Sequence, residues 1–290
     1  MQLGEKLGEG AYGTVYALSD DRVIKVFKKL VTMEEIITER DVARKVYDLG
    51  IPTANAYDII EMEDGSYGLE FDRIRGRKLS EVMLEHPERF DEYISMTAET
   101  LRHLHSIDGT KAGFPGIKQT YTDFLKGSAD WYTAGELSAL LALVDSIPDR
   151  NTLIHGDYDP CNLMLQDDKL YVIDMDSMCT GHPAFELLST SANLYILSDY
   201  NPDFLMYRTG MTPEFAKNTW NGILRNYFAG SSEDEIGRIN GQILALARLK
   251  SATAPVFGKN LPREIIQSSV DTAKEYLLPL IDKLIGSIDW

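Results

Sequence analysis

Two carboxylates and one amide stand out in the segment from Leu153 to Asp176. Asp157 and Asn162 are separated by four residues on a stretch too rich in Gly and Pro to be regular, and Asp174 follows the apolar run 170–173. Carboxylate and amide oxygens are the hard ligands that Mg²⁺ prefers, and a positioned carboxylate can accept a proton from a hydroxyl. Polar loop residues near Gly and Pro commonly only cap turns, so the interpretation depends on the joint spacing.

That spacing resembles the H-x-D-x-x-x-x-N loop of protein-kinase-like phosphotransferases, with His155, Asp157 and Asn162 in the three positions. The form His-Gly-Asp, followed by Ile-Asp in place of Asp-Phe-Gly, is similar to the aminoglycoside phosphotransferase and choline kinase family. The resemblance implies that Asp157 is the catalytic residue, which accepts or orients the proton of the acceptor hydroxyl, and that Asn162 and Asp174 hold Mg²⁺. Asp176 lies where choline-kinase-like members carry an acid, which implies a second metal contact; a turn cap is the alternative.

A second pattern near the start of the chain concerns phosphate binding. Gly8, Gly10 and Gly13 form G-x-G-x-x-G within residues 6–27, whose alternation predicts two strands joined by a turn at 19–21. In a dinucleotide-binding fold, this motif lies between a strand and a helix. Here strand follows strand, which favours a kinase-type flap whose backbone N–H groups approach the phosphates of ATP.

The next strand and helix supply an ion pair in this interpretation. Lys25 lies where the resemblance implies a lysine on the α- and β-phosphates. Residues 32–49 show an apolar stripe typical of a helix, and this helix carries Glu34, Glu35 and Glu39. Its sequence setting favours Glu39 as the partner of Lys25; an exposed glutamate on a helix face is the alternative.

Two further strands are predicted at 56–62 and 67–73, followed by a hinge. The resemblance implies that the adenine of ATP binds hinge backbone near Glu70 and Phe71. The predicted fold is α+β and two-lobed, protein-kinase-like: a small N-terminal nucleotide-binding lobe (1–74) with an antiparallel sheet and one helix, and a larger, mostly helical catalytic and substrate-binding lobe (75–290).

Helical periodicity predicts most of the second lobe. Glu186-Leu187 stands where related enzymes have Asp-Leu, and the longer side chain could still brace the catalytic loop. The expected helices are 92–107, 121–125, 136–147, one from Ala184, 212–228, 232–252 and 262–285.

Composition restricts the partners. The 290 residues carry a formal net charge of −16, which disfavours nucleic acid and anionic membrane and attracts cationic acceptors such as aminoglycosides or choline, although solubility alone explains the charge equally well. No secretion signal or membrane-spanning stretch is evident, so a cytoplasmic location is expected. Two cysteines, Cys161 and Cys179, without CxxC spacing predict neither a disulfide framework nor a zinc site.

These patterns together predict an ATP- and Mg²⁺-dependent phosphotransferase that moves the γ-phosphoryl group to a hydroxyl of a small aminoglycoside-, choline- or sugar-like molecule. A protein serine/threonine kinase is one alternative, disfavoured because only a short turn follows Asp174 and no Ala-Pro-Glu-like segment comes after it. A non-catalytic nucleotide-binding protein is the other.

Overall fold

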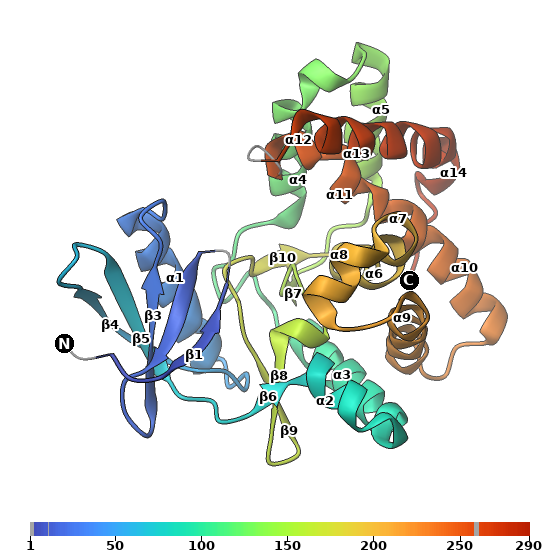
Figure 1. Cartoon of the computed structure of the whole chain (residues 1–290). Coiled ribbons are helices and arrows are strands. Elements are labelled where there is room, and N and C mark those ends of the chain that lie inside the picture. Colours follow the sequence, from blue (N-terminus) through green and yellow to red (C-terminus); the bar gives the residue numbers. More distant parts are fainter. Residues whose placement is uncertain (1–2, 11, 258–260) are drawn as a thin grey trace. The chain divides into compact units, whose positions relative to one another are not determined.

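An antiparallel five-stranded sheet forms the first part of the chain, with strand order β1-β2-β3-β5-β4 (Figure 1). The computed structural model describes residues 3–10, 12–257 and 261–290. The strands of this sheet are β1 (Lys6–Glu9), β2 (Gly13–Ala17), β3 (Arg22–Phe27), β4 (Ala56–Glu61) and β5 (Tyr67–Asp72).

The glycine-rich segment connects β1 to β2. Residues 6–27 form three strands where the sequence predicted two, because the chain reverses between β1 and β2, where the Gly10 N–H donates to the Gly13 carbonyl at 2.8 Å. Strand thus follows strand at the G-x-G-x-x-G motif, as predicted, but the motif itself runs from β1 into β2, which the sequence did not predict.

One helix, α1 (Met33–Asp48), packs on this sheet, mainly against β4. Thr32 and Glu35 form a reciprocal capping box at its start, which satisfies backbone N–H groups that a helix leaves unpaired at that end. Ile36 and Val46 of the predicted apolar stripe, together with Ala43, form its buried face, whereas Met33 and Ile37 of that stripe are exposed. The small sheet with one helix is thus confirmed.

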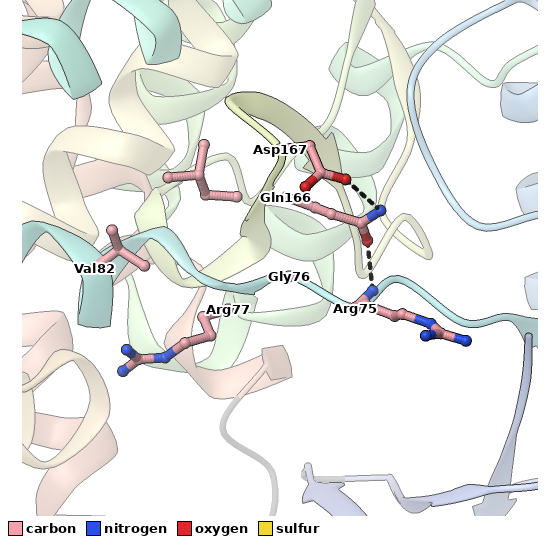
Figure 2. Close-up of a pocket in the computed structure, with 7 residues that line it drawn as sticks. Arg75, Gly76, Arg77, Val82, Gln166 and Asp167 are labelled. Carbon is pink, nitrogen blue, oxygen red and sulfur yellow. Dashed lines mark hydrogen bonds between the residues drawn. The ribbon is translucent and has the colours of Figure 1, made fainter. Parts of the chain in front are cut away.

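A second, three-stranded sheet of order β6-β8-β9 belongs to the same compact unit. Its strands are β6 (Arg77–Lys78), β8 (Leu163–Gln166), which follows the 3₁₀ turn η3 (Pro160–Asn162), and β9 (Lys169–Val172). Figure 2 shows the Gln166 side chain next to the Arg75 backbone, whose N–H donates to Gln166 Oε1 at 2.6 Å. Gly76 approaches β8 so closely that a Cβ atom there would overlap the Leu165 backbone.

These contacts divide the chain differently from the predicted boundary at residue 74. The first compact unit comprises residues 1–82 and 160–177, and the second comprises 83–159 and 178–290. The segment 160–177 joins the first unit because β8 pairs with β6 and because the Val172 N–H donates to the Pro52 carbonyl. Such pairings between distant residues leave no local pattern in the sequence.

The second unit is mostly helical, with one two-stranded sheet of β7 and β10. Its core includes Leu125, Leu140, Phe185, Leu249 and Ala273, all buried. The elements are β7 (Thr152–Ile154), β10 (Cys179–Gly181), α2 (Leu79–Glu85, across the unit boundary), η1 (Pro87–Arg89), α3 (Phe90–His105), α4 (Ile117–Gly127), η2 (Ala129–Trp131), α5 (Ala134–Ser146), α6 (Ala184–Ser191), the π-helix η4 (Ala192–Ile196), α7 (Leu197–Tyr200), α8 (Pro202–Thr209), α9 (Pro213–Tyr227), α10 (Glu233–Leu246), α11 (Arg248–Ala252), α12 (Ala254–Phe257), α13 (Arg263–Tyr276), η5 (Leu278–Leu280) and α14 (Ile281–Leu284).

The predicted helices at 92–107, 136–147 and 212–228 are confirmed within about two residues. The helix expected at 262–285 is interrupted at η5, where Pro279 supplies no N–H group and fixes its own φ. The helix expected at 232–252 is divided at Ala247. Within the described ranges, no helix is both long and apolar enough to cross a membrane.

Candidate active site

An ion pair joins β3 and α1 in the first unit. Lys25 Nζ lies 2.7 Å from Glu39 Oε1, and the two side chains are 18% and 19% exposed. The side chain of Glu35, another of the three candidate glutamates, instead accepts a hydrogen bond from the backbone N–H of Thr32 in the helix cap. The structure therefore brings together the lysine and the glutamate that the sequence paired.

Two further acids, Asp174 and Asp176, influence the pKa of Glu39. Burial raises the pKa of Glu39 above its usual value, Lys25 opposes that rise, and the charges of Asp176 and Asp174 raise the pKa further. Asp174 has a φ of +62°, a backbone conformation that non-glycine residues rarely adopt and that occurs preferentially at functional sites. The negative charges of Asp174 and Asp176 therefore act on Glu39, the partner of Lys25.

Asn162 lies at the end of η3, buried, and its carbonyl accepts a hydrogen bond from the Ile173 N–H at 3.0 Å. This bond ties the last residue of the predicted loop motif to the residue before Asp174 in the sequence. In the part of the chain that the structure describes, no three His, Cys, Asp or Glu side chains are grouped as a preformed metal site.

The glycines of the turn differ in what surrounds them. A Cβ at Gly13 would lie 2.7 Å from the Val26 carbonyl oxygen on β3, so the close pairing of strands requires glycine there. A Cβ at Gly8 would meet no atom within 4 Å, and one at Gly10 none closer than 3.9 Å. The chain's own packing therefore does not require these two glycines, which leaves room for a ligand to approach the backbone.

Glu70 and Phe71 lie within β5, where β3 and β4 pair with the strand on its two sides. Glu70 is opposite Ile24 and its carboxylate contacts Arg22 Nε at 3.2 Å. The backbone of both residues is thus part of the sheet, and β5 continues to Asp72.

In the second unit, one buried carboxylate holds residues 155–158 of the predicted catalytic loop. Glu186 on α6 is fully buried and accepts hydrogen bonds from the backbone N–H groups of His155 (2.5 Å), Gly156 (3.0 Å) and Tyr158 (3.3 Å). Three such bonds to a buried charge fix the loop backbone on both sides of Asp157. The brace that the sequence suggested for Glu186 is therefore present.

Three side chains surround the carboxylate of Asp157. Asn193 Nδ2, in the π-helical turn, donates to Asp157 Oδ1 at 2.8 Å and to Asp159 Oδ2 at 2.9 Å. Arg208 on α8 binds the fully buried Asp159, with Nη2 3.9 Å from Asp157 Oδ2. Lys250 Nζ on α11 lies 3.7 Å from Asp157 Oδ1.

The charge state of Asp157 follows from this environment. Burial raises the pKa of Asp157, but Lys250, Arg208 and the Asn193 hydrogen bond outweigh it and hold that pKa below its ordinary value. Asp157 is therefore an ionised carboxylate at neutral pH, the form that can accept a proton.

The sequence did not identify Asn193, Arg208 or Lys250. They follow the catalytic loop by tens of residues on three separate helical elements, and none stands at a recognisable offset from it. The π-helical turn around Asn193 is a feature often found at functional sites, but it is visible only in the structure.

Comparison with known proteins gives the family. The family model described as the phosphotransferase enzyme family matches residues 4–211, most of the chain, and the chain therefore belongs to that family. No curated protein sequence matches the chain significantly.

Several solved structures share its fold. The gentamicin complex of APH(2")-IIa has 16% identity and a TM-score of 0.63, covering 97% of this chain and 93% of that chain. The apo form of a thermostable mutant of the aminoglycoside phosphotransferase APH(4)-Ia has 16% identity and a TM-score of 0.60, with coverages of 95% and 94%. A choline/ethanolamine kinase family protein from Mesorhizobium loti has 16% identity and a TM-score of 0.57, with coverages of 98% and 91%.

These similarities confirm the kinase-like α+β fold and the resemblance to aminoglycoside phosphotransferases and choline kinases. The family assignment makes the protein a phosphotransferase, and its fold is of the kinase type.

Proposed function

We propose that this phosphotransferase uses ATP and Mg²⁺ to move the γ-phosphoryl group to a hydroxyl of a small molecule. The observation that carries the proposal is the ion pair of Lys25 with Glu39, beside the acids Asp174 and Asp176. Phosphoryl transfer needs a cation on the phosphates and acids that hold a metal ion, and this arrangement supplies both.

The first unit would bind the nucleotide. Lys25, oriented by Glu39, binds the α- and β-phosphates, and the backbone at Gly8 and Gly10 approaches the phosphates through the open space around it. The base binds hinge backbone. We place that contact just beyond Glu70 and Phe71, since the N–H groups of Asp72 and Arg73 already bond to Asn55 and Asp21 and the next residue is Ile74.

The donor set fits Mg²⁺ because it consists of hard oxygen atoms, two of them on the carboxylates of Asp174 and Asp176, whose charges act on Glu39. Asn162 and Asp174 are the proposed ligands, and Asp176 is a further one. When bound, Mg²⁺ would neutralise charge on the phosphates.

The second unit would supply the acid–base chemistry. Asp157 accepts the proton of the acceptor hydroxyl while the hydroxyl oxygen bonds to the γ-phosphorus and the bond to the leaving oxygen of ADP breaks. Asn193 fixes the direction of the carboxylate, and Glu186 holds the loop backbone. The acceptor is a small hydroxylated molecule; the proposal needs neither nucleic acid nor membrane as a partner, and the proposed location is the cytoplasm.

A protein serine/threonine kinase is a weaker candidate. Residues 175–183, with the short strand β10, are all that separates Asp174 from the start of α6. A protein kinase seats its peptide on an ordered activation segment, for which this connection is too short.

The test is ADP release from Mg·ATP with a panel of aminoglycosides, choline, ethanolamine, sugars, nucleosides and a generic protein. Asp157→Asn should lower kcat at least about 100-fold while ATP binding persists. The matched control Asp234→Asn, at an exposed acid of α10, should leave kcat unchanged. A rise with protein alone would favour the protein kinase, and ATP binding without any turnover would identify a non-catalytic nucleotide-binding protein.

A further inference from the structure

Both oxygens of the Asp157 carboxylate have a cation nearby. Lys250 Nζ is 3.7 Å from Oδ1, and Arg208 Nη2 is 3.9 Å from Oδ2. Lys250 is held in this place because its ammonium group donates to Ser189 Oγ at 2.8 Å, while the Ser189 hydroxyl donates to the Gly156 carbonyl at 2.8 Å. The lysine is therefore a fixed part of the loop's surroundings.

This geometry limits where an acceptor can place its charges. The reacting hydroxyl must come within about 3 Å of one carboxylate oxygen of Asp157 to lose its proton. Whichever oxygen it uses, a positive side chain then lies within about 7 Å of it, which is shorter than the screening length at physiological salt. The acceptor atoms bonded near that hydroxyl therefore experience the field of Lys250 or Arg208.

The local charge also differs from that of the whole chain. The chain carries −16, but at the loop Arg208 neutralises Asp159, Lys250 neutralises Asp157, and the charge of Glu186 is taken up by three N–H groups. An ammonium group on the acceptor would find no uncompensated carboxylate among these residues and would be close to two like charges. Over such short distances the local charges outweigh the distant ones.

We propose that Lys250, supported by Arg208, is a specificity-determining residue that selects acceptors without positive charge next to the reacting hydroxyl. The acceptor class is thus neutral or anionic hydroxyl compounds, and amines and quaternary ammonium compounds are poor acceptors. This inference rests on the proposed role of Asp157 and replaces the expectation of a cationic acceptor that the net charge alone suggested.

The experiment compares matched probes that differ only in charge: 3-amino-1,2-propanediol, glycerol and glycerate, and glucosamine, glucose and glucuronate. Asp157-dependent ADP release is measured with each probe and with water alone. We expect kcat/KM for the amino member to be at least about tenfold below that of its neutral counterpart. Lys250→Met should reduce this ratio to about threefold or less, and Lys250→Arg should restore it, with KM for ATP unchanged.

Lys217→Met is the matched control, because Lys217 also pairs with a carboxylate, that of Asp199, and has a side chain of similar exposure, 30% against 29% for Lys250. It should leave the ratio unchanged. Preference for the amino members, or a ratio that Lys250→Met does not alter, would overturn the inference while the enzyme remains active.

If no probe raises ADP release above hydrolysis by water, the same probes are compared as inhibitors of that hydrolysis. Weaker inhibition by the amino members than by their neutral counterparts supports the inference, and equal or stronger inhibition overturns it. Absence of any Asp157-dependent ADP release would instead refute the proposed function, and the inference with it.

Discussion

Replacement of Glu186 tests how the catalytic loop is held. Its carboxylate is fully buried, Oε1 accepts from the N–H groups of Gly156 and Tyr158, and Oε2 accepts from that of His155. Glu186→Ala removes all three acceptors and leaves three N–H groups in a buried place. Glu186→Gln keeps one acceptor oxygen and replaces the other with an NH₂ group, which cannot accept a hydrogen bond from the backbone N–H group that faces it.

The magnitudes follow from the number of bonds lost. A hydrogen bond to a charged group contributes roughly 1.5–3 kcal/mol, so Glu186→Gln, which loses one, should lower the free energy of unfolding by about 2 kcal/mol. Glu186→Ala loses three and opens a cavity, but the surroundings relax and the cost of burying a charge disappears, so we expect about 5 kcal/mol. Because the loop carries Asp157, kcat should fall in both variants more than KM for ATP rises.

Stability is measured by urea unfolding at neutral pH, where an unchanged m-value shows that the shift in midpoint reports stability. Initial rates of ADP release give kcat and KM for ATP. The matched control is Glu233→Gln, at an exposed glutamate that pairs with Arg225 on the surface, which should change stability by no more than about 0.5 kcal/mol. If the free energy of unfolding of Glu186→Ala lies within about 1 kcal/mol of that of the unsubstituted protein, the three bonds do not hold the loop and the reasoning is wrong.

Two further predictions concern the glycine turn and a buried histidine. Gly13→Ala should destabilise the fold by about 1–3 kcal/mol, because its Cβ would meet the Val26 carbonyl. Gly10→Ala should change stability by about 0.5 kcal/mol or less and should weaken ATP binding. Urea unfolding and ATP titration of both variants test this, and equal destabilisation by the two substitutions would contradict it. Burial lowers the pKa of His182 from 6.5 to about 4, so the unfolded chain binds the proton first as pH falls. Native stability should therefore decrease from pH 6.5 down to about 4, by about 3 kcal/mol from this group. His182→Asn should lose less free energy of unfolding than the unsubstituted protein between about pH 7.5 and about pH 5. Equal losses in the variant and in the unsubstituted protein, measured from unfolding curves at the two pH values, would refute this prediction.

Much of the first unit could be predicted because its signals are local. The alternation of strands and the helix at 32–49 arise from residues that are neighbours along the chain or one turn apart. The pairing of Lys25 with Glu39 was predicted because the family motif supplies the lysine and the helix pattern restricts the glutamate. The extra turn at the glycines was missed, since glycine leaves no side-chain period to read.

The sequence by itself determined the kinase-like class, the succession of a small antiparallel sheet with one helix and a mostly helical remainder, and the spacing of Asp157, Asn162 and Asp174 along the chain. Only the tertiary structure decided that β8 pairs with β6, and that Asn193, Arg208 and Lys250 surround the carboxylate of Asp157. The physical reason is that such contacts join residues on separate elements, so neither period nor spacing encodes them. Charge follows the same rule. Composition alone gives the net charge of −16, but the paired charges around Asp157 depend on which side chains the fold brings together.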